Sequence, residues 1–253
     1  MFIKTLLLLM AADVLWAKHI AHPENRIIGG SNTAIEIAPW QVSLQGKNKT
    51  AEYNHICGGS LIRPDIVLTA GHCVIYQPPE ILRVRVGSSN KNIGGQLIPV
   101  AKIVIHEDIY INHLRNLSLH DVAVLRLRYP VKIGPSAQTI ALAEYEPPVG
   151  VKALTTGWGK MSNGHKAIIL QGVNLPILPH SICITRPAAN DGNICAGLGD
   201  TGACFEDSGG PLVVNKRLVG IVSGGSYTCD SVTIFVSVPL YHQWILNAID
   251  NLL

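Results

Sequence analysis

The sequence lacks several features that would point to particular classes of protein. Only 15% of its 253 residues are charged, and 20 basic residues are dispersed among 17 acidic ones. Because there is no basic stripe, binding to nucleic acid or to a membrane surface is not indicated. There is no internal repeat or low-complexity tract, and the 24 Gly and 15 Pro are scattered. With 47% hydrophobic residues, the chain is not a disordered one and can bury a sizeable core.

The N-terminus carries a short hydrophobic run. Residues 5–17 are mostly apolar and end at the small residue Ala17. This run is shorter than the ~20 residues that span a bilayer, and Asp13 interrupts it. We therefore predict that residues 1–17 are a signal peptide and that the protein is secreted and extracellular, with no membrane anchor.

The cysteines fit an oxidising compartment. Six cysteines follow the predicted signal, and none forms the CxxC pair of a structural zinc site. We interpret them as disulfides, although the residues alone leave 15 connectivities open. Two sequons, at Asn48 and Asn116, are predicted glycosylation sites on surface loops.

The pattern along the chain predicts strands. From residue 39 onward, short apolar runs rich in β-branched residues alternate with turn residues. This pattern is typical of antiparallel strands in barrels or sandwiches rather than βαβ units. Little helix is expected before residue 239. Near the C-terminus, helical spacing predicts a docking helix with one apolar face, formed by Tyr241, Trp244, Ile245, Ala248, Ile249 and Leu252.

Three segments carry residues suited to nucleophilic catalysis. They are residues 69–73 (TAGHC), 120–125 (HDVAVL) and 206–211 (EDSGGP). Together with residues 26–30 (RIIGG) and 156–159 (TGWG), they resemble the trypsin and chymotrypsin-like serine proteases from Ile27 to about Leu253. The order His, Asp, Ser is that of the chymotrypsin triad.

The resemblance implies a role for each of the three residues. A serine hydroxyl is a weak nucleophile until a base removes its proton. His72 would act as that base for Ser208 and later return the proton to the leaving amine. Asp121 would fix the tautomer of His72 and stabilise its charged form.

The family also implies a fold and an activation route. We expect an all-β fold of two antiparallel six-stranded barrels, at about 27–137 and 138–238, followed by a C-terminal helix at about 239–253. Residues 18–26 resemble an activation propeptide. An upstream trypsin-like protease would cleave after Arg26, and the freed α-amine of Ile27 would pair with Asp207. The disulfides implied by the family are Cys57–Cys73, Cys183–Cys195 and Cys204–Cys229.

The sequence departs from the family just before the nucleophile. The usual run is Gly-Asp-Ser-Gly-Gly, and here Glu206 replaces its first Gly. The backbone N–H groups of Glu206 and Ser208 would form the oxyanion hole, in which losing one donor costs roughly 2.7 to 4 kcal/mol. Two outcomes stay open. The Cβ and carboxylate could perturb the hole and slow catalysis, or the side chain could turn into solvent and leave the hole intact.

The specificity pocket departs from trypsin as well. Alignment on the motif places Gly202 at the pocket base, where trypsin-like enzymes carry an aspartate, with Ser223, Gly225 and Thr233 on the walls. An uncharged pocket predicts a preference for apolar side chains. A shift of alignment in the short loop before Thr233 could instead bring Asp230 into the pocket.

No metal or cofactor is expected. The stretch that matches the family's calcium loop, residues 87–96, has no Asp or Glu. Nine histidines other than His72 fit no metal motif and are interpreted as structural.

We expect a secreted serine endopeptidase zymogen acting on proteins or peptides as a monomer. It resembles small digestive or reproductive-tract proteases of insects, specifically of Diptera. The alternative is a protease-like binding protein with little or no turnover, because Glu206 would damage the oxyanion hole.

Overall fold

The computed structural model describes residues 30–112, 117–161, 164–186, 189–197, 199, 202–204, 206–225 and 232–252. The predicted signal peptide and propeptide lie outside these ranges, as do Ile27, Asn116, Cys229 and Asp230. Within the described ranges, no helix is both long and hydrophobic enough to cross a membrane.

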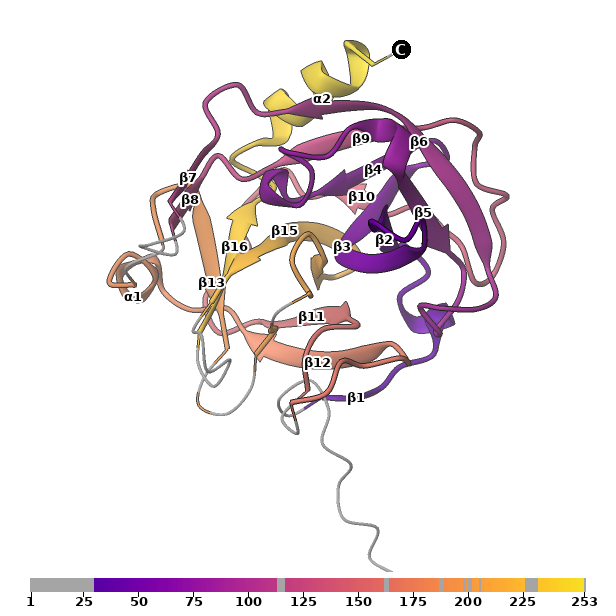
Figure 1. The fold of residues 1–253 in the computed structure, drawn as a ribbon. Coiled ribbons are helices and arrows are strands. Elements are labelled where there is room, and N and C mark those ends of the chain that lie inside the picture. The colour runs from indigo at the N-terminus through magenta and orange to yellow at the C-terminus, as the bar shows by residue number, and fades with distance from the viewer. Residues whose placement is uncertain are drawn as a thin grey trace, which may run out of the picture.

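Six antiparallel strands in the N-terminal half close into a barrel (Figure 1). In order around the barrel they are β2 (Gln41–Lys47), β3 (Tyr53–Arg63), β4 (Ile66–Thr69), β9 (Ala123–Leu127), β6 (Gln96–Ile105) and β5 (Leu82–Val86). Strand β5 shows why these segments form strands. Its sequence LRVRV places Leu82, Val84 and Val86 in the core, because successive side chains of a strand point to opposite faces.

A second sheet follows, and its six main strands are also antiparallel. Their order is β12 (Gln171–Pro176), β11 (Lys152–Gly157), β14 (Pro211–Val214), β15 (Arg217–Gly224), β16 (Thr233–Ser237) and β13 (Asn193–Ala196). The two ends meet at a single bridge between Ile177 and Ala196 rather than along a ladder. Pro176, which ends β12, has no N–H to extend the pairing. The predicted all-β fold class is confirmed, with one difference: the second sheet forms a half-barrel rather than a second closed barrel, because only this one bridge joins its ends.

Short elements complete the fold. They are β1 (Ser31–Asn32), β10 (Ala141–Leu142), the hairpin of β7 (Tyr110–Asn112) and β8 (Leu117–Leu119), the 3-10 turns at Ile35–Ile37, Gly71–Cys73 and Pro79–Ile81, and helices α1 (His180–Cys183) and α2 (His242–Asp250). Strand β1 pairs with β12, so the chain just after the predicted cleavage point is tied to the second sheet.

Helix α2 follows the second sheet in sequence but packs on the first barrel (Figure 1). Five residues of the predicted apolar stripe are buried in the core that fills the first barrel: Tyr241, Ile245, Ala248, Ile249 and Leu252. Burying one face of an amphipathic helix removes apolar surface from water. The helix therefore fastens the end of the second half of the chain to the first half.

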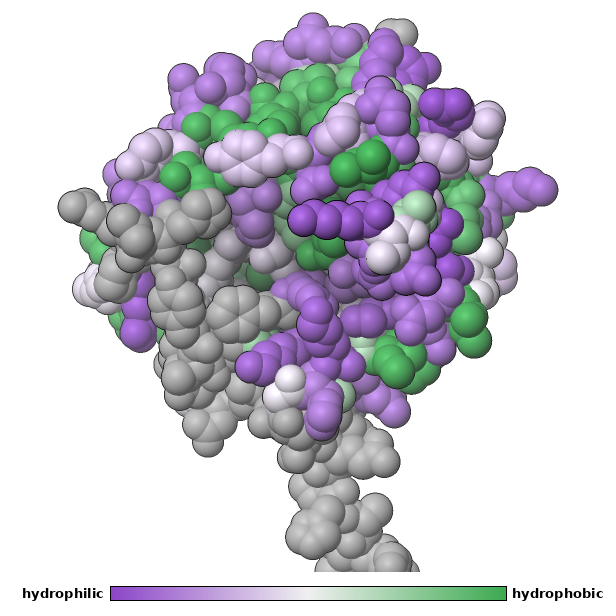
Figure 2. Space-filling view, in the orientation of Figure 1, coloured by the Kyte–Doolittle hydropathy of each residue, from purple (hydrophilic) through white to green (hydrophobic). Residues whose placement is uncertain are grey.

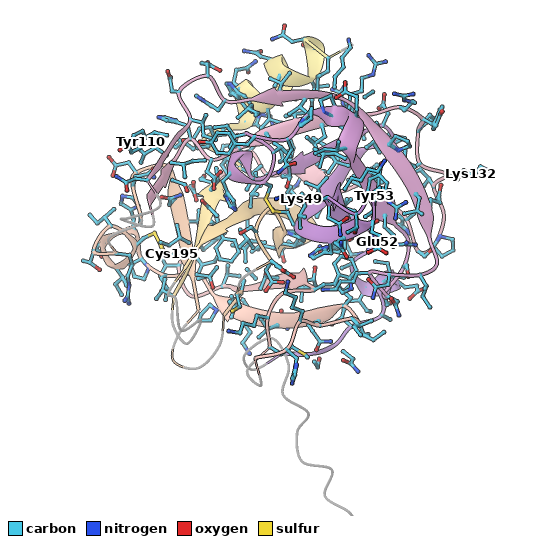
Figure 3. The ribbon with its side chains drawn as sticks, viewed as in Figure 1. Lys49, Glu52, Tyr53, Tyr110, Lys132 and Cys195 are labelled. Carbon is cyan, nitrogen blue, oxygen red and sulfur yellow. A yellow bond between two sulfur atoms is a disulfide. The ribbon has the colours of Figure 1, made fainter. Side chains whose placement is uncertain are left out.

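The surface is more polar than the core. On the face drawn in Figure 2, the coloured residues are largely hydrophilic, with smaller hydrophobic patches between them. Figure 3 shows Lys49, Glu52 and Tyr53 close together at the turn that joins β2 and β3. Asn48 lies in the same turn and is exposed.

Candidate active site

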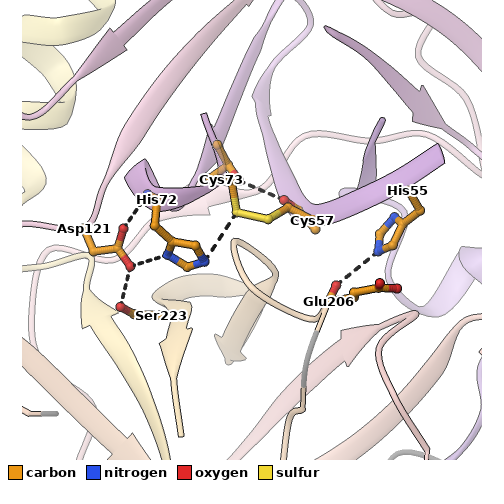
Figure 4. The surroundings of a disulfide bond; sticks show 9 residues. His55, Cys57, His72, Cys73, Asp121, Glu206 and Ser223 are labelled. Carbon is orange, nitrogen blue, oxygen red and sulfur yellow. Dashed lines mark hydrogen bonds and ion pairs between the residues drawn. A yellow bond between two sulfur atoms is a disulfide. The ribbon is translucent and has the colours of Figure 1, made fainter. Parts of the chain in front are cut away.

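His72 is presented by the turn that follows β4. The 3-10 turn Gly71–Cys73 carries it, and a disulfide from Cys73 to Cys57 on β3 ties this turn to the barrel (Figure 4). Asp121 lies between β8 and β9, directly after His120, whose φ is 50°. The first barrel thus supplies both side chains from neighbouring strand ends.

The structure brings His72 and Asp121 into direct contact. The Nδ1 atom of His72 lies 2.7 Å from Oδ2 of Asp121, and the backbone N–H of His72 donates to Oδ1 at 2.8 Å. The hydroxyl of Ser223, on β15 of the second sheet, donates to Oδ2 at 2.5 Å (Figure 4). Because an ionised carboxylate only accepts, Nδ1 carries the proton and Nε2 keeps a lone pair.

Electrostatics favour the charged forms of this pair. Burial alone would raise the pKa of the Asp121 carboxyl, but His72 and the hydrogen bonds from His72 and Ser223 outweigh burial and hold that pKa below its ordinary value. Burial would likewise lower the pKa of His72, and Asp121 raises it above its ordinary value. Asp121 is therefore suited to stabilise an imidazolium that forms transiently.

Ser208 lies in a turn of the second sheet that is fixed against the first barrel. Its carbonyl accepts a hydrogen bond from the N–H of Gly58 on β3 at 2.7 Å. Gly209 has a φ of 79°, and a Cβ there would lie 2.2 Å from the hydroxyl of Thr69. Only glycine fits such a close approach. The turn therefore seats Ser208 at the junction between the two halves.

Two N–H groups in this turn are available to a ligand. Within the described ranges, the N–H groups of Glu206 and Ser208 donate to no protein group. Two unpaired N–H donors with one residue between them are suited to form an oxyanion hole. Among the hydrogen bonds of the described residues there is none between His72 and Ser208. The Nε2 atom of His72 lies 3.8 Å from Sγ of Cys73.

Asp207 is buried below the turn. Its carboxylate accepts the N–H of Gly159 at 2.8 Å and of Cys204 at 2.9 Å, and no cation of the described residues forms an ion pair with it. Burial raises the pKa of Asp207 to about 6, against the lowering effect of these hydrogen bonds. Among the described residues, Asp207 therefore has no ion-pair partner, and Lys91 lowers its pKa only in part.

The carboxylate of Glu206 is bound by two lysines of the chain. Its φ is 73°, in the left-handed region that favours glycine. Its carboxylate forms ion pairs with Lys91 and Lys166, at 3.9 Å for Lys91 Nζ, and its carbonyl accepts from Nε2 of His55 at 3.1 Å. His55 also contacts the hydroxyl of Ser43 at 2.8 Å. His55 was expected to be structural, and no sequence motif marks either lysine.

Three of the predicted pocket residues lie on neighbouring segments, because a Cβ on Gly225 would lie 3.9 Å from Cα of Thr233 and Gly202 directly precedes Ala203, which contacts Thr233. Gly202 and Thr233 are buried, and the Thr233 hydroxyl accepts a hydrogen bond from the N–H of Ala203 at 3.0 Å. A Cβ on Gly224 would meet no atom of the described residues within 4 Å. None of the pocket positions within the described ranges carries a charge. Asp230, the open alternative, lies outside them.

The loop at residues 87–96 is organised by a guanidinium. Arg85 on β5 donates to the carbonyl oxygens of Lys91 at 3.0 Å, Asn92 at 2.8 Å and Gly94. A cation supplied by the chain thus satisfies carbonyl groups that point into the loop. This contact also fixes the backbone of Lys91.

Two predicted disulfides are confirmed, Cys57–Cys73 and Cys183–Cys195. Figure 3 labels Cys195 on β13, beside α1. Cys204 is disulfide-bonded as well, and its expected partner Cys229 lies outside the described residues.

The trypsin family model matches residues 27–245. The chain belongs to the trypsin family. It is 39% identical to trypsin iota of Drosophila melanogaster over 88% of both chains, and 36% identical to a trypsin of Sarcophaga bullata over 88% of both. The predicted resemblance to dipteran proteases is thereby confirmed, and the protein is a serine endopeptidase.

Solved structures of the family agree in fold. The inactivated protease paralogue S-D1 of the scabies mite matches with a TM-score of 0.78 and 26% identity, covering 89% of this chain and 98% of that one. Neuropsin, a serine protease of mouse brain, matches with a TM-score of 0.76 and 28% identity, covering 87% of this chain and 98% of that one.

Proposed function

We propose that this trypsin-family protease is a secreted zymogen, activated by cleavage after Arg26, that hydrolyses peptide bonds next to apolar side chains through an acyl-enzyme on Ser208. The observation that carries the assignment of roles is the 2.7 Å contact between His72 Nδ1 and Asp121 Oδ2. It leaves Nε2 of His72 as the one ring nitrogen able to accept the serine proton.

The chemistry divides into two steps. In acylation, Oγ of Ser208 bonds to the scissile carbonyl carbon while its proton passes to Nε2 of His72. The negative oxygen is then stabilised by the N–H groups of Glu206 and Ser208. When the C–N bond breaks, His72 gives the proton to the leaving amine. In deacylation, water attacks the ester and His72 again transfers the proton.

Activation would complete the turn that carries Ser208. Asp207 is buried and has no ion-pair partner among the described residues, so the α-ammonium of Ile27 would supply a counter-charge.

The neutral pocket supports apolar specificity. Gly202 presents no carboxylate to a basic side chain, and burying an unpaired guanidinium is strongly unfavourable. An apolar side chain would enter without that cost. Secretion is supported by the predicted signal peptide and by the disulfides, and the exposed Asn48 remains a proposed glycosylation site.

The test is a cleavage profile of the activated protein. Secreted precursor is cleaved with immobilised trypsin, purified away from it, labelled with a fluorophosphonate and assayed against a peptide library. We expect labelling at Ser208 and cleavage after apolar residues, with the Ser208→Ala precursor treated identically as the control. Cleavage after Arg or Lys would refute the neutral pocket, and absence of both labelling and hydrolysis would favour a binding protein.

A further inference from the structure

The backbone conformation of Glu206 needs external support. A φ of 73° is readily adopted by glycine but is rare for a residue with a side chain. Such a conformation persists only where its surroundings impose it. One support is the hydrogen bond from His55 to the Glu206 carbonyl, and the others hold the carboxylate.

Lys91 is the rigid one of the two lysines that bind this carboxylate. Its side chain is only 9% exposed, whereas that of Lys166 is 65% exposed. Lys91 Nζ also donates to the carbonyl of Trp158 at 3.3 Å. An exposed lysine loses much of its attraction to solvent screening and side-chain freedom, so the buried one exerts the firmer constraint.

The backbone of Lys91 is fixed on every side. Its N–H donates to Ile168 at 3.1 Å, and its carbonyl accepts from Gln45 at 2.9 Å and from Arg85 at 3.0 Å. These contacts come from β2, from β5 and from the chain before β12. Lys91 therefore presents its ammonium from a position that cannot follow a moving Glu206.

The pair is reciprocal. Burial lowers the pKa of Lys91, and Glu206 opposes this effect. Glu206 is the only ion-pair partner of Lys91 among the described residues, and leaving a buried ammonium without a partner is costly. If the Glu206 carboxylate turned toward the oxyanion position, it would abandon Lys91 and place negative charge where negative charge develops. In Figure 4 the Glu206 side chain lies on the His55 side and points away from His72.

We propose that Lys91 is a positioning residue, which holds the carboxylate of Glu206 away from the oxyanion hole and so keeps the Glu206 N–H available to the substrate. This inference rests on the proposed function of Glu206 as an oxyanion donor. It explains how the chain tolerates glutamate where the family usually has glycine.

The experiment compares Lys91→Met in two backgrounds after activation. With Glu206 present, we expect kcat on a small amide to fall by about tenfold or more, toward the ~100- to 1000-fold cost of losing an oxyanion donor, with little change in KM. In a Glu206→Gly background, where no carboxylate exists, Lys91→Met should change kcat by less than about twofold. Lys160→Met removes the same charge from an exposed lysine that has no ion pair with Glu206 in the described residues, and should leave kcat unchanged.

Several results would overturn the proposal. An equal loss of kcat in both backgrounds would show that Lys91 affects catalysis through its loop and not through Glu206. An unchanged kcat with Glu206 present would show that Lys91 has no positioning role. If Lys91→Met alone fails to fold, recovery of folding and activity in the Glu206→Gly double variant supports the proposal, and failure of the double variant refutes it. Absence of hydrolysis by the activated wild type would instead defeat the proposed function. Urea unfolding of the four proteins would then still show whether Lys91 and Glu206 are coupled.

Discussion

The buried carboxylate of Asp207 makes the stability of the precursor depend on pH. Its pKa is raised from an ordinary 3.8 to about 6. Each pKa unit corresponds to ~1.36 kcal/mol, so ionising Asp207 costs the uncleaved chain about 3 kcal/mol. The sign follows directly. Between pH 3.8 and 6 the folded state binds the proton more tightly than the unfolded state, so stability falls as pH rises through this window.

The assay is urea unfolding of the Ser208→Ala precursor from pH 3.5 to pH 7, with Asp207→Asn added as the reference. Replacing the carboxylate by an amide also disturbs a backbone hydrogen bond, but that cost is nearly independent of pH. Burial lowers the pKa of His55 to about 3, so His55 destabilises the folded protein as the pH falls below 6.5, opposite in sign to the effect of Asp207. It is present in both proteins and cancels in their difference. We expect the Asp207 protein to lose about 3 kcal/mol relative to the reference across this range.

Cleavage after Arg26 should abolish this loss. If the α-ammonium of Ile27 pairs with Asp207, the pKa of the carboxyl drops, and the difference between Asp207 and Asp207→Asn becomes flat or rises with pH. A difference that is already flat in the uncleaved protein would refute the claim that Asp207 is an unpaired buried carboxylate. A loss that persists unchanged after cleavage would refute the proposed activation.

Three further outcomes are expected of the activated enzyme and its precursor. Because Asp121 raises the pKa of His72, kcat/KM should fall on acidification with a midpoint above 6.5, and Asp121→Asn should lower kcat about 10,000-fold; a midpoint at or below 6.5 would contradict the paired geometry. Ser208→Ala should remove turnover while changing the free energy of unfolding by less than about 0.5 kcal/mol, and residual hydrolysis free of contaminating protease would exclude Ser208 as the nucleophile. Precursor incubated with its own mature form should not yield Ile27 as a new N-terminus, whereas a trace of trypsin should produce it; equal rates would show that the pocket accepts Arg26 despite Gly202.

Local sequence signals predicted antiparallel strands and the C-terminal helix, whereas the two-barrel fold and part of the site were predicted from the resemblance to the family. Alternating apolar residues predicted the strands, and helical spacing predicted the stripe that α2 buries. The motifs predicted that His72 and Asp121, 49 residues apart, would meet, and the structure places them 2.7 Å apart. The local geometry of each motif does not bring the two residues together; their contact was predicted because the motifs resemble those of a family in which the two residues meet.

Contacts between distant segments that no motif marks could not be predicted from the sequence. Lys91 and Glu206 lie in different halves of the chain, and no periodicity links them. His55 also looked unremarkable, since a lone histidine on a strand is most often structural. The only local signal was the replacement of glycine by glutamate, which left open whether the oxyanion hole is perturbed. The position of Lys91 beside Glu206 depends on the loop that Arg85 holds, which is a property of the tertiary fold.

The comparison of the two solved relatives shows where turnover has to be decided. The scabies mite paralogue described as inactivated and the serine protease neuropsin match this chain with TM-scores of 0.78 and 0.76. Because the two values are nearly equal, the course of the backbone does not separate an inactivated protein from an active one. The difference has to lie in a few side chains and N–H groups. In this chain the turn from Glu206 to Ser208 carries two such N–H groups, which donate to no protein group in the described ranges, and we propose that Lys91 keeps the first of them available.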